Sequence, residues 1–96
     1  MAIGLIIRLK GIGADKYDAV QKELGLDKPT SQWPDGLVSH VAGPSGRDWC
    51  VVDVYQSQAH FDKFLASHLG PAMAKVGGIP QPDVTPFEVH NRYKHG

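Results

Sequence analysis

Three side chains combine titratable chemistry with positions that should face the protein interior. His68 falls in the middle of the apolar stripe of an expected helix over residues 58–76. It is either a core histidine hydrogen-bonded to the backbone or a base that its surroundings tune near neutral pH. Asp53 lies in an expected central strand, where a buried carboxylate needs a partner. That partner is either a contact within a dimer or a histidine that Asp53 orients for proton transfer.

His40 is the candidate partner of Asp53, and the register of a hairpin decides whether the two share a face. Residues 43–46, Gly-Pro-Ser-Gly, predict the hairpin turn. In one register His40 lies opposite Trp49 and shares the face of Asp53. In the register shifted by one residue, His40 lies opposite Cys50 on the other face, because side chains alternate along a strand. We favour the first register.

Neither a metal site nor a nucleotide-binding loop is expected. His90 and His95 lie near the chain end, and no set of His, Asp and Glu has convincing metal-ligand spacing. Gly11-x-Gly13 lacks the rest of a dinucleotide-binding fingerprint. We therefore expect no metal and no cofactor.

Composition narrows the possible partners. The 96 residues predict one domain, and 10 Lys and Arg balance 10 Asp and Glu. This neutrality argues against a nucleic-acid partner and against a basic membrane-binding patch. The apolar run at the N-terminus is too short for a signal peptide, and no stretch approaches a membrane span. The single cysteine, Cys50, suits a reducing compartment, so we expect a cytoplasmic protein.

The elements that must position these side chains follow from hydrophobic periodicity and from turn residues. Both faces of the first and third strands are largely apolar, so both faces should be covered. Pro71 should bend the second helix at 67–71 without ending it. Pro86 should either place the last strand at an edge of the sheet or lie at an irregular start of that strand. The expected elements are strand 2–9, helix 14–25, loop 26–36, strand 37–42, strand 49–55, helix 58–76 and strand 84–93.

This βαββαβ order predicts an α+β, ferredoxin-like fold over residues 1–96. Two βαβ crossovers and one hairpin give a four-stranded antiparallel sheet with two helices on one face. Side chains such as Ile3 or Ile6 must then meet something on the other face. The simplest cover is a second copy of the sheet, so the pattern predicts a homodimer.

Several segments together resemble the dimeric α/β-barrel superfamily, close to its antibiotic-biosynthesis-monooxygenase-like and actinobacterial members. The strand 49–55 runs directly into Ser57 and Phe61-x-x-Phe64-Leu65, and residues 69–72 (Leu-Gly-Pro-Ala) and 87–91 (Phe-Glu-Val-His-Asn) follow. The resemblance covers nearly the whole chain. It implies sheets that close into an α/β barrel across a dimer, and a cavity between sheet and helices in each protomer. Tyr55 stands where an aromatic residue often lines that cavity.

The haem-degrading branch of this superfamily is disfavoured by three positions. Ile7 stands where that branch carries an Asn, and Phe64 stands where it carries a Trp. Met73 or Ala74 stands where that branch has its axial His. These changes remove the polar contact and the haem ligand.

These interpretations together predict a pocket for a small hydrophobic or aromatic ligand. Proton transfer by a histidine would give a cofactor-independent enzyme, monooxygenase-like or cyclase- or isomerase-like, acting on an aromatic or polyketide-like substrate. The alternative is a non-catalytic dimer that binds a ligand or serves as an accessory subunit. Trp33 either plugs the core edge or closes the pocket mouth. The expected catalytic residues are His68, Asp53 and His40, and the expected substrate-binding residues are Tyr55, Trp49, Phe64, Trp33 and Ile7.

Overall fold

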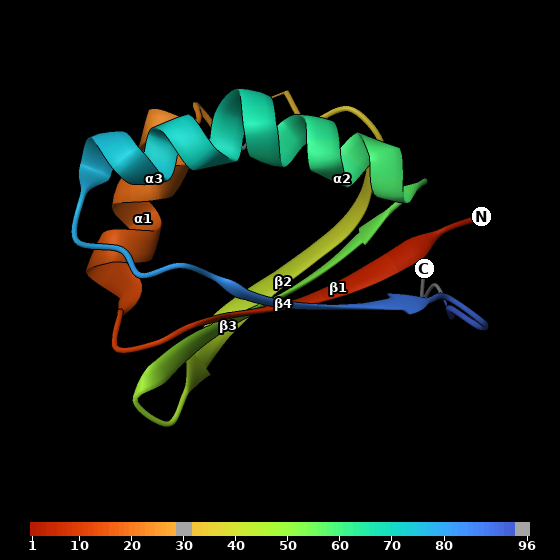
Figure 1. The fold of residues 1–96 in the computed structure, drawn as a ribbon, viewed down its shortest axis with the longest axis horizontal. Helices are drawn as coiled ribbons and strands as arrows, with labels where there is room; N and C mark the ends of the chain where they lie inside the picture. The colour runs from red at the N-terminus through yellow and green to blue at the C-terminus, as the bar shows by residue number, and fades with distance from the viewer. Residues whose placement is uncertain (29–31, 94–96) are drawn as a thin grey trace.

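The computed structural model describes residues 1–28 and 32–93 and has the predicted α+β, ferredoxin-like architecture. The four strands form one antiparallel sheet in the order β2-β3-β1-β4, and the helices lie on one side of it (Figure 1). The elements are β1 (Ile3–Leu9), α1 (Ala14–Glu23), β2 (Leu37–Ser45), β3 (Asp48–Tyr55), α2 (Gln58–Phe64), the π-helical turn η1 (Leu65–Leu69), α3 (Gly70–Val76) and β4 (Asp83–Glu88).

The core lies between the inner face of the sheet and the helices. Every second residue of β3 is buried, as alternation along a strand requires. Leu5 and Tyr55 are the most deeply buried large side chains, and Phe61 of α2 packs on Tyr55 with ring centroids 5.5 Å apart. Asp53 is the one buried charged residue in the described part of the chain, and it lies on this inner face.

The outer face of the sheet carries no helix and is largely apolar. Ile6, Val41 and Phe87 are 37%, 68% and 43% exposed on it. The ring of Phe87 lies directly on Gly4, where a side-chain Cβ would overlap it. Glycine is therefore required at this point of β1, because the outer face is packed across the β1–β4 pair.

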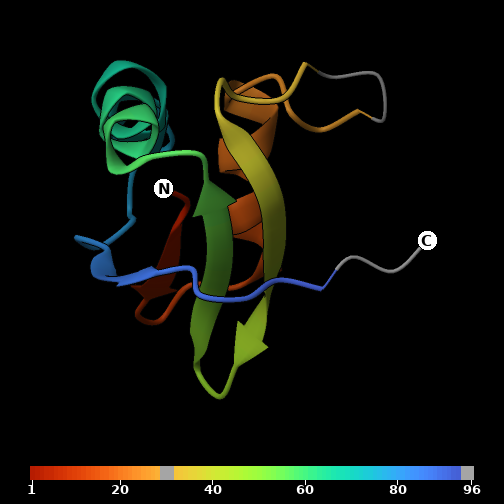
Figure 2. The same cartoon turned by 90° about the vertical axis from the view of Figure 1, so that its right-hand side faces the viewer.

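The β2–β3 hairpin is longer than predicted, and its register differs. β2 runs to Ser45, and the turn lies at Gly46, whose φ is +62°. His40 therefore lies opposite Asp53, not opposite Trp49 as predicted. Because the difference is an even number of residues, His40 remains on the Asp53 face. Figure 2 shows the two strands side by side, joined at the turn.

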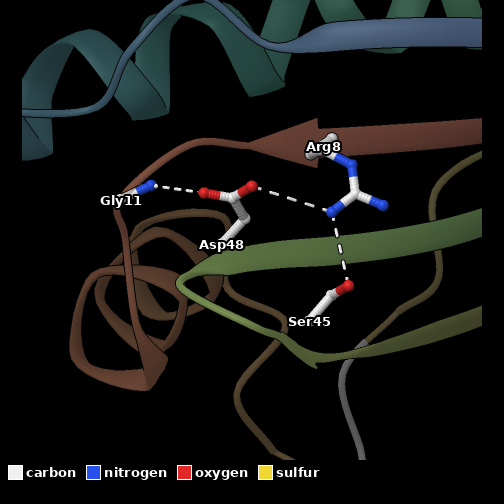
Figure 3. Close-up of polar contacts among 4 residues, drawn as sticks. All are labelled: Arg8, Gly11, Ser45 and Asp48. Carbon is white, nitrogen blue, oxygen red and sulfur yellow. Dashed lines mark hydrogen bonds and ion pairs between the residues drawn. The ribbon is translucent and has the colours of Figure 1, made fainter.

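Polar contacts hold the tip of this hairpin against the end of β1 (Figure 3). The backbone N–H of Gly11 donates to Oδ1 of Asp48 at 3.1 Å, and Arg8 lies 3.7 Å from Oδ2 of the same carboxylate. The Arg8 guanidinium also donates to Oγ of Ser45 at 3.3 Å. These contacts join both strands of the hairpin to β1 and so fix the extended register.

The predicted helix over residues 58–76 is continuous, but its irregularity is a π turn. Ser57 caps it, accepting the backbone N–H of His60 at 3.3 Å. The N–H of Gly70 bonds to the carbonyl of Leu65, five residues back, and Pro71 has no N–H to offer. The backbone stays helical through Leu69 and Gly70, so α2, η1 and α3 form one run (Figure 1).

Two other boundaries differ from the expectation. α1 ends at Glu23, and β4 covers residues 83–88, not 84–93. β4 is an edge strand that contains Pro86, as predicted.

Candidate functional site

A cavity of about 230 Å³ lies between the inner face of the sheet and the helices. Residues of β1, β2, β3 and α1 and of the α2–α3 run line the cavity, together with residues of the connecting loops. Most of this lining is apolar. Six of the residues expected at the site from the sequence line it: Ile7, Trp33, His40, Asp53, Tyr55 and Phe64.

Three of the polar side chains that line this cavity form a hydrogen-bonded chain. Nδ1 of His40 lies 2.5 Å from Oδ1 of Asp53, and Nε2 of His40 lies 2.5 Å from the hydroxyl of Tyr17. Because a carboxylate only accepts, the neutral imidazole carries its proton on Nδ1. Nε2 then accepts from the Tyr17 hydroxyl. This is the arrangement of a base oriented by a carboxylate and in contact with a proton donor.

The sheet and the helix layer together position the three hydrogen-bonded side chains. His40 and Asp53 face each other across the β2–β3 pair, and Tyr17 comes down from α1. The Asp53 side chain is 9% exposed and that of His40 is 28% exposed, so water reaches the histidine more readily than the carboxylate. The rings of Tyr17 and His40 are nearly parallel, with centroids 6.1 Å apart.

Trp49 does not line the cavity in the described structure, contrary to the expectation. Its ring packs on Tyr17 at a centroid distance of 5.0 Å, so it supports the hydroxyl-bearing ring from outside the cavity lining. Its indole Nε1 is buried and has no hydrogen-bond partner among the described residues.

Burial raises the pKa of the two phenols at the site. Burial, assisted by the charges of Asp53 and then Asp18, raises the pKa of Tyr17 to about 12. Burial and then Asp53 also raise the pKa of Tyr55 above its ordinary value. Both hydroxyls therefore stay protonated to a higher pH than a tyrosine in water does.

His68 lies outside this cavity, and its expected place in the site is wrong. Its side chain is exposed and lines a second pocket, with its ring centroid 5.9 Å from that of Phe64. The π turn explains the difference, because it advances fewer degrees per residue than an α-helix. The helix after Leu65 is thereby rotated, and Leu69 and Met73 line the cavity in place of His68.

Tyr17 is a candidate site residue that the sequence did not predict. It lies in the inward stripe of α1, together with Val20, and such a stripe is read as core. The available signal was its hydroxyl, because a buried tyrosine needs a hydrogen-bond partner. A titratable pair on the facing strands supplies that partner.

Residues 1–28 and 32–93 contain no group of three or more His, Cys, Asp or Glu placed to hold a metal ion. Within the same ranges, the helices are too short or too polar to cross a bilayer.

Comparisons with known proteins find similarity in structure. No protein-family model and no curated protein sequence matches the chain. Rv0793 from Mycobacterium tuberculosis is similar with a TM-score of 0.71 and 18% identity, covering 98% of this chain and 100% of that one. NE2512, a protein of unknown function from Nitrosomonas europaea, has a TM-score of 0.72 and 20% identity over 99% and 95% of the two chains.

SnoaB from Streptomyces nogalater, described as a cofactor-independent oxygenase, has a TM-score of 0.65 and 14% identity over 98% of each chain. Identities at this level establish shared architecture. A protein from Deinococcus radiodurans described as a putative antibiotic biosynthesis monooxygenase has a TM-score of 0.61 and 12% identity over 100% of this chain and 99% of that one. The chain therefore shares the ferredoxin-like fold of antibiotic-biosynthesis-monooxygenase-like proteins, as its sequence resemblance predicted.

Proposed function

We propose that this protein is a cofactor-independent enzyme that removes a proton from a small aromatic or polyketide-like substrate. The observation that carries the proposal is the Asp53–His40–Tyr17 chain, which opens into a cavity with mostly apolar walls. Apolar walls suit a ring-shaped substrate, and the histidine paired with a carboxylate is suited to act as a general base.

The proton moves in two linked transfers. The substrate's acidic C–H or O–H bond breaks as its proton bonds to the Tyr17 oxygen. The Tyr17 O–H bond breaks at the same time, and that proton bonds to Nε2 of His40. Tyr17 ends neutral, which its raised pKa of about 12 favours. The substrate is left as an enolate or phenolate, and the new imidazolium is stabilised by the Asp53 carboxylate at Nδ1.

The anion then has two fates, and the first is oxygenation. The carbon of the anion bonds to O₂ and gives a peroxide anion, which takes back the proton held by the imidazolium and becomes a hydroperoxide. Loss of water from this hydroperoxide, at a carbon that was a CH₂ group in the substrate, leaves a carbonyl group. The shared fold of SnoaB, described as a cofactor-independent oxygenase, supports this fate. In the second fate, the same anion closes a ring or shifts a bond, as in a cyclase or isomerase.

We further propose that the enzyme is a homodimer joined through the outer faces of its sheets. Ile6, Val41 and Phe87 leave an apolar surface there that no helix covers. A second copy related by a two-fold axis would bury the same surface on both protomers. A cytoplasmic location fits the single unpaired cysteine.

The test uses 2-tetralone, a bicyclic ketone with an acidic C–H. Exchange of its C1 protons in D₂O is followed by proton NMR, with dissolved oxygen recorded in parallel. We expect protein-dependent exchange without added metal or cofactor, and a fall of about 10²-fold in His40→Gln, the usual scale for losing a general base. His90→Gln, at an exposed position after β4, is the matched control and should keep full exchange.

Oxygen uptake that accompanies exchange assigns the oxygenase fate, whereas exchange alone assigns the cyclase or isomerase class. Equal exchange by wild type, His40→Gln and the protein-free blank would contradict catalysis. The non-catalytic, ligand-binding dimer would then be the better description.

A further inference from the structure

A second pocket of about 320 Å³ adjoins the first one. Five residues line both spaces, namely Leu24, Leu26, Trp33, Pro34 and Phe64. We call the first space the inner cavity and the second the outer pocket. Because the same residues line both spaces, the two spaces lie side by side.

The two spaces differ in chemistry. The described residues that line only the outer pocket are all polar: Gln32, Asp35, His60, Lys63 and His68. Lys63 carries an ammonium group, and His60 and His68 carry imidazoles that can hold a positive charge. Asp35 is the opposing charge. The outer pocket thus offers up to three positive groups against one carboxylate, next to an inner cavity with mostly apolar walls.

His60 is held in place at this pocket. Its Nδ1 lies 2.6 Å from the hydroxyl of Ser57, which also caps the helix. Gly36 lies against the ring, where a Cβ would overlap it, and the φ of Gly36 is +81°. A preorganised imidazole loses less entropy on binding than a mobile side chain does.

We propose that the outer pocket binds a carboxylate of the substrate, whose ring body occupies the inner cavity. This inference rests on the proposed function for the identity of the inner ligand. The substrate class is then an aromatic or polyketide-like acid. One lysine, two histidines and an opposing Asp35 suit a single negative charge better than a phosphate dianion, which proteins commonly bind with arginine or with several backbone N–H groups.

Isothermal titration calorimetry with a matched pair of ligands tests this. The acid is 6-hydroxy-2-naphthoate and the neutral analogue is 6-hydroxy-2-naphthamide, which has nearly the same shape. We expect the wild type to bind the acid about three- to tenfold more tightly than the amide, the scale of a partly solvated charged contact. Lys63→Gln should weaken acid binding by that factor and leave amide binding unchanged.

Lys10→Gln is the control, because Lys10 is exposed and is outside the lining of both pockets as described. It should keep the preference for the acid. Equal affinity of the wild type for acid and amide, an unchanged preference in Lys63→Gln, or no binding of either compound would overturn the proposal.

The two proposals fail separately. Equal binding of acid and amide together with normal proton exchange removes only the outer carboxylate site. A lasting preference for the acid without any proton exchange removes only the proposed catalysis.

Discussion

Asp53 and His40 lie directly opposite each other in the β2–β3 pair, and this places Oδ1 of the carboxylate 2.5 Å from Nδ1 of the imidazole. Two backbones linked by ladder hydrogen bonds thus hold the pair, and no flexible loop is involved. Such support suits a residue that must keep one tautomer and one orientation during proton transfer.

Asp53→Asn should reduce 2-tetralone proton exchange by about 10²-fold while the protein remains folded. The amide keeps the shape of the carboxylate but carries no charge to stabilise the imidazolium. Its NH₂ group can also donate to Nδ1 and so favour the wrong tautomer. NMR exchange rates and far-ultraviolet circular dichroism measure the two properties. Full activity in this variant would show that His40 works without its carboxylate.

Tyr17→Phe separates transfer through Tyr17 from direct transfer to His40. If the proton passes through the Tyr17 hydroxyl, the variant should lose exchange by about 10²-fold. The ring and its packing on Trp49 are retained, so the fold should persist. Tyr93→Phe, at a position that is 91% exposed, is the matched control. Undiminished or faster exchange in Tyr17→Phe would assign His40 as the direct base.

Tyr17 should also make the folded state less stable at high pH. Folding raises its pKa from 10.0 to about 12, so between these values the unfolded chain has released a proton that the folded chain still holds. The free energy of unfolding therefore falls as pH rises through this window, and the contribution is fully present below pH 10. Because the Tyr17 side chain is only partly buried, the effect should be about 1 kcal/mol.

Urea unfolding at pH 9 and at pH 11.5 measures this contribution. Tyr17→Phe should lose less stability between the two pH values than wild type does, whereas Tyr93→Phe should lose as much as wild type. A Tyr17→Phe variant with the same loss as wild type would contradict the assignment.

Ile6→Asp should break the proposed dimer, because it places an unpaired charge in the apolar outer face of the sheet. Light scattering should give about twice the chain mass of 10.4 kDa for the wild type and the single mass for the variant. Lys10→Asp, an exposed position nearby in sequence, controls for the added charge. A wild type that scatters as a monomer at micromolar concentration would end the dimer proposal.

The fold could be predicted because its signals are local and repeated. Alternation along β3 predicted which residues share a face, and Pro86 predicted an edge strand, since each pattern depends only on neighbouring residues. The family resemblance identified that face of β3 as the inner one. The hairpin register was harder, because Gly43 and Gly46 are both suitable turn residues and only Gly46 takes up positive φ.

The site was predicted in part for the same reason. The favoured register predicted that His40 and Asp53 share a face. They do, because the observed register differs from the favoured one by an even number of residues. His68 was misplaced because a fixed 100° per residue does not hold across a π turn. Tyr17 was missed because its role depends on a contact between α1 and β2 that no local pattern encodes.

The number of residues in the π turn determines which side chains of the following helix line the cavity. Such a turn amounts to one residue inserted into a helix, and here it brings Leu69 and Met73 to the cavity wall. A one-residue deletion at Ser67 would rotate the rest of the helix back and change several wall residues at once. Insertion or deletion at this single point is thus a route by which the fold can acquire a different ligand without altering its sheet.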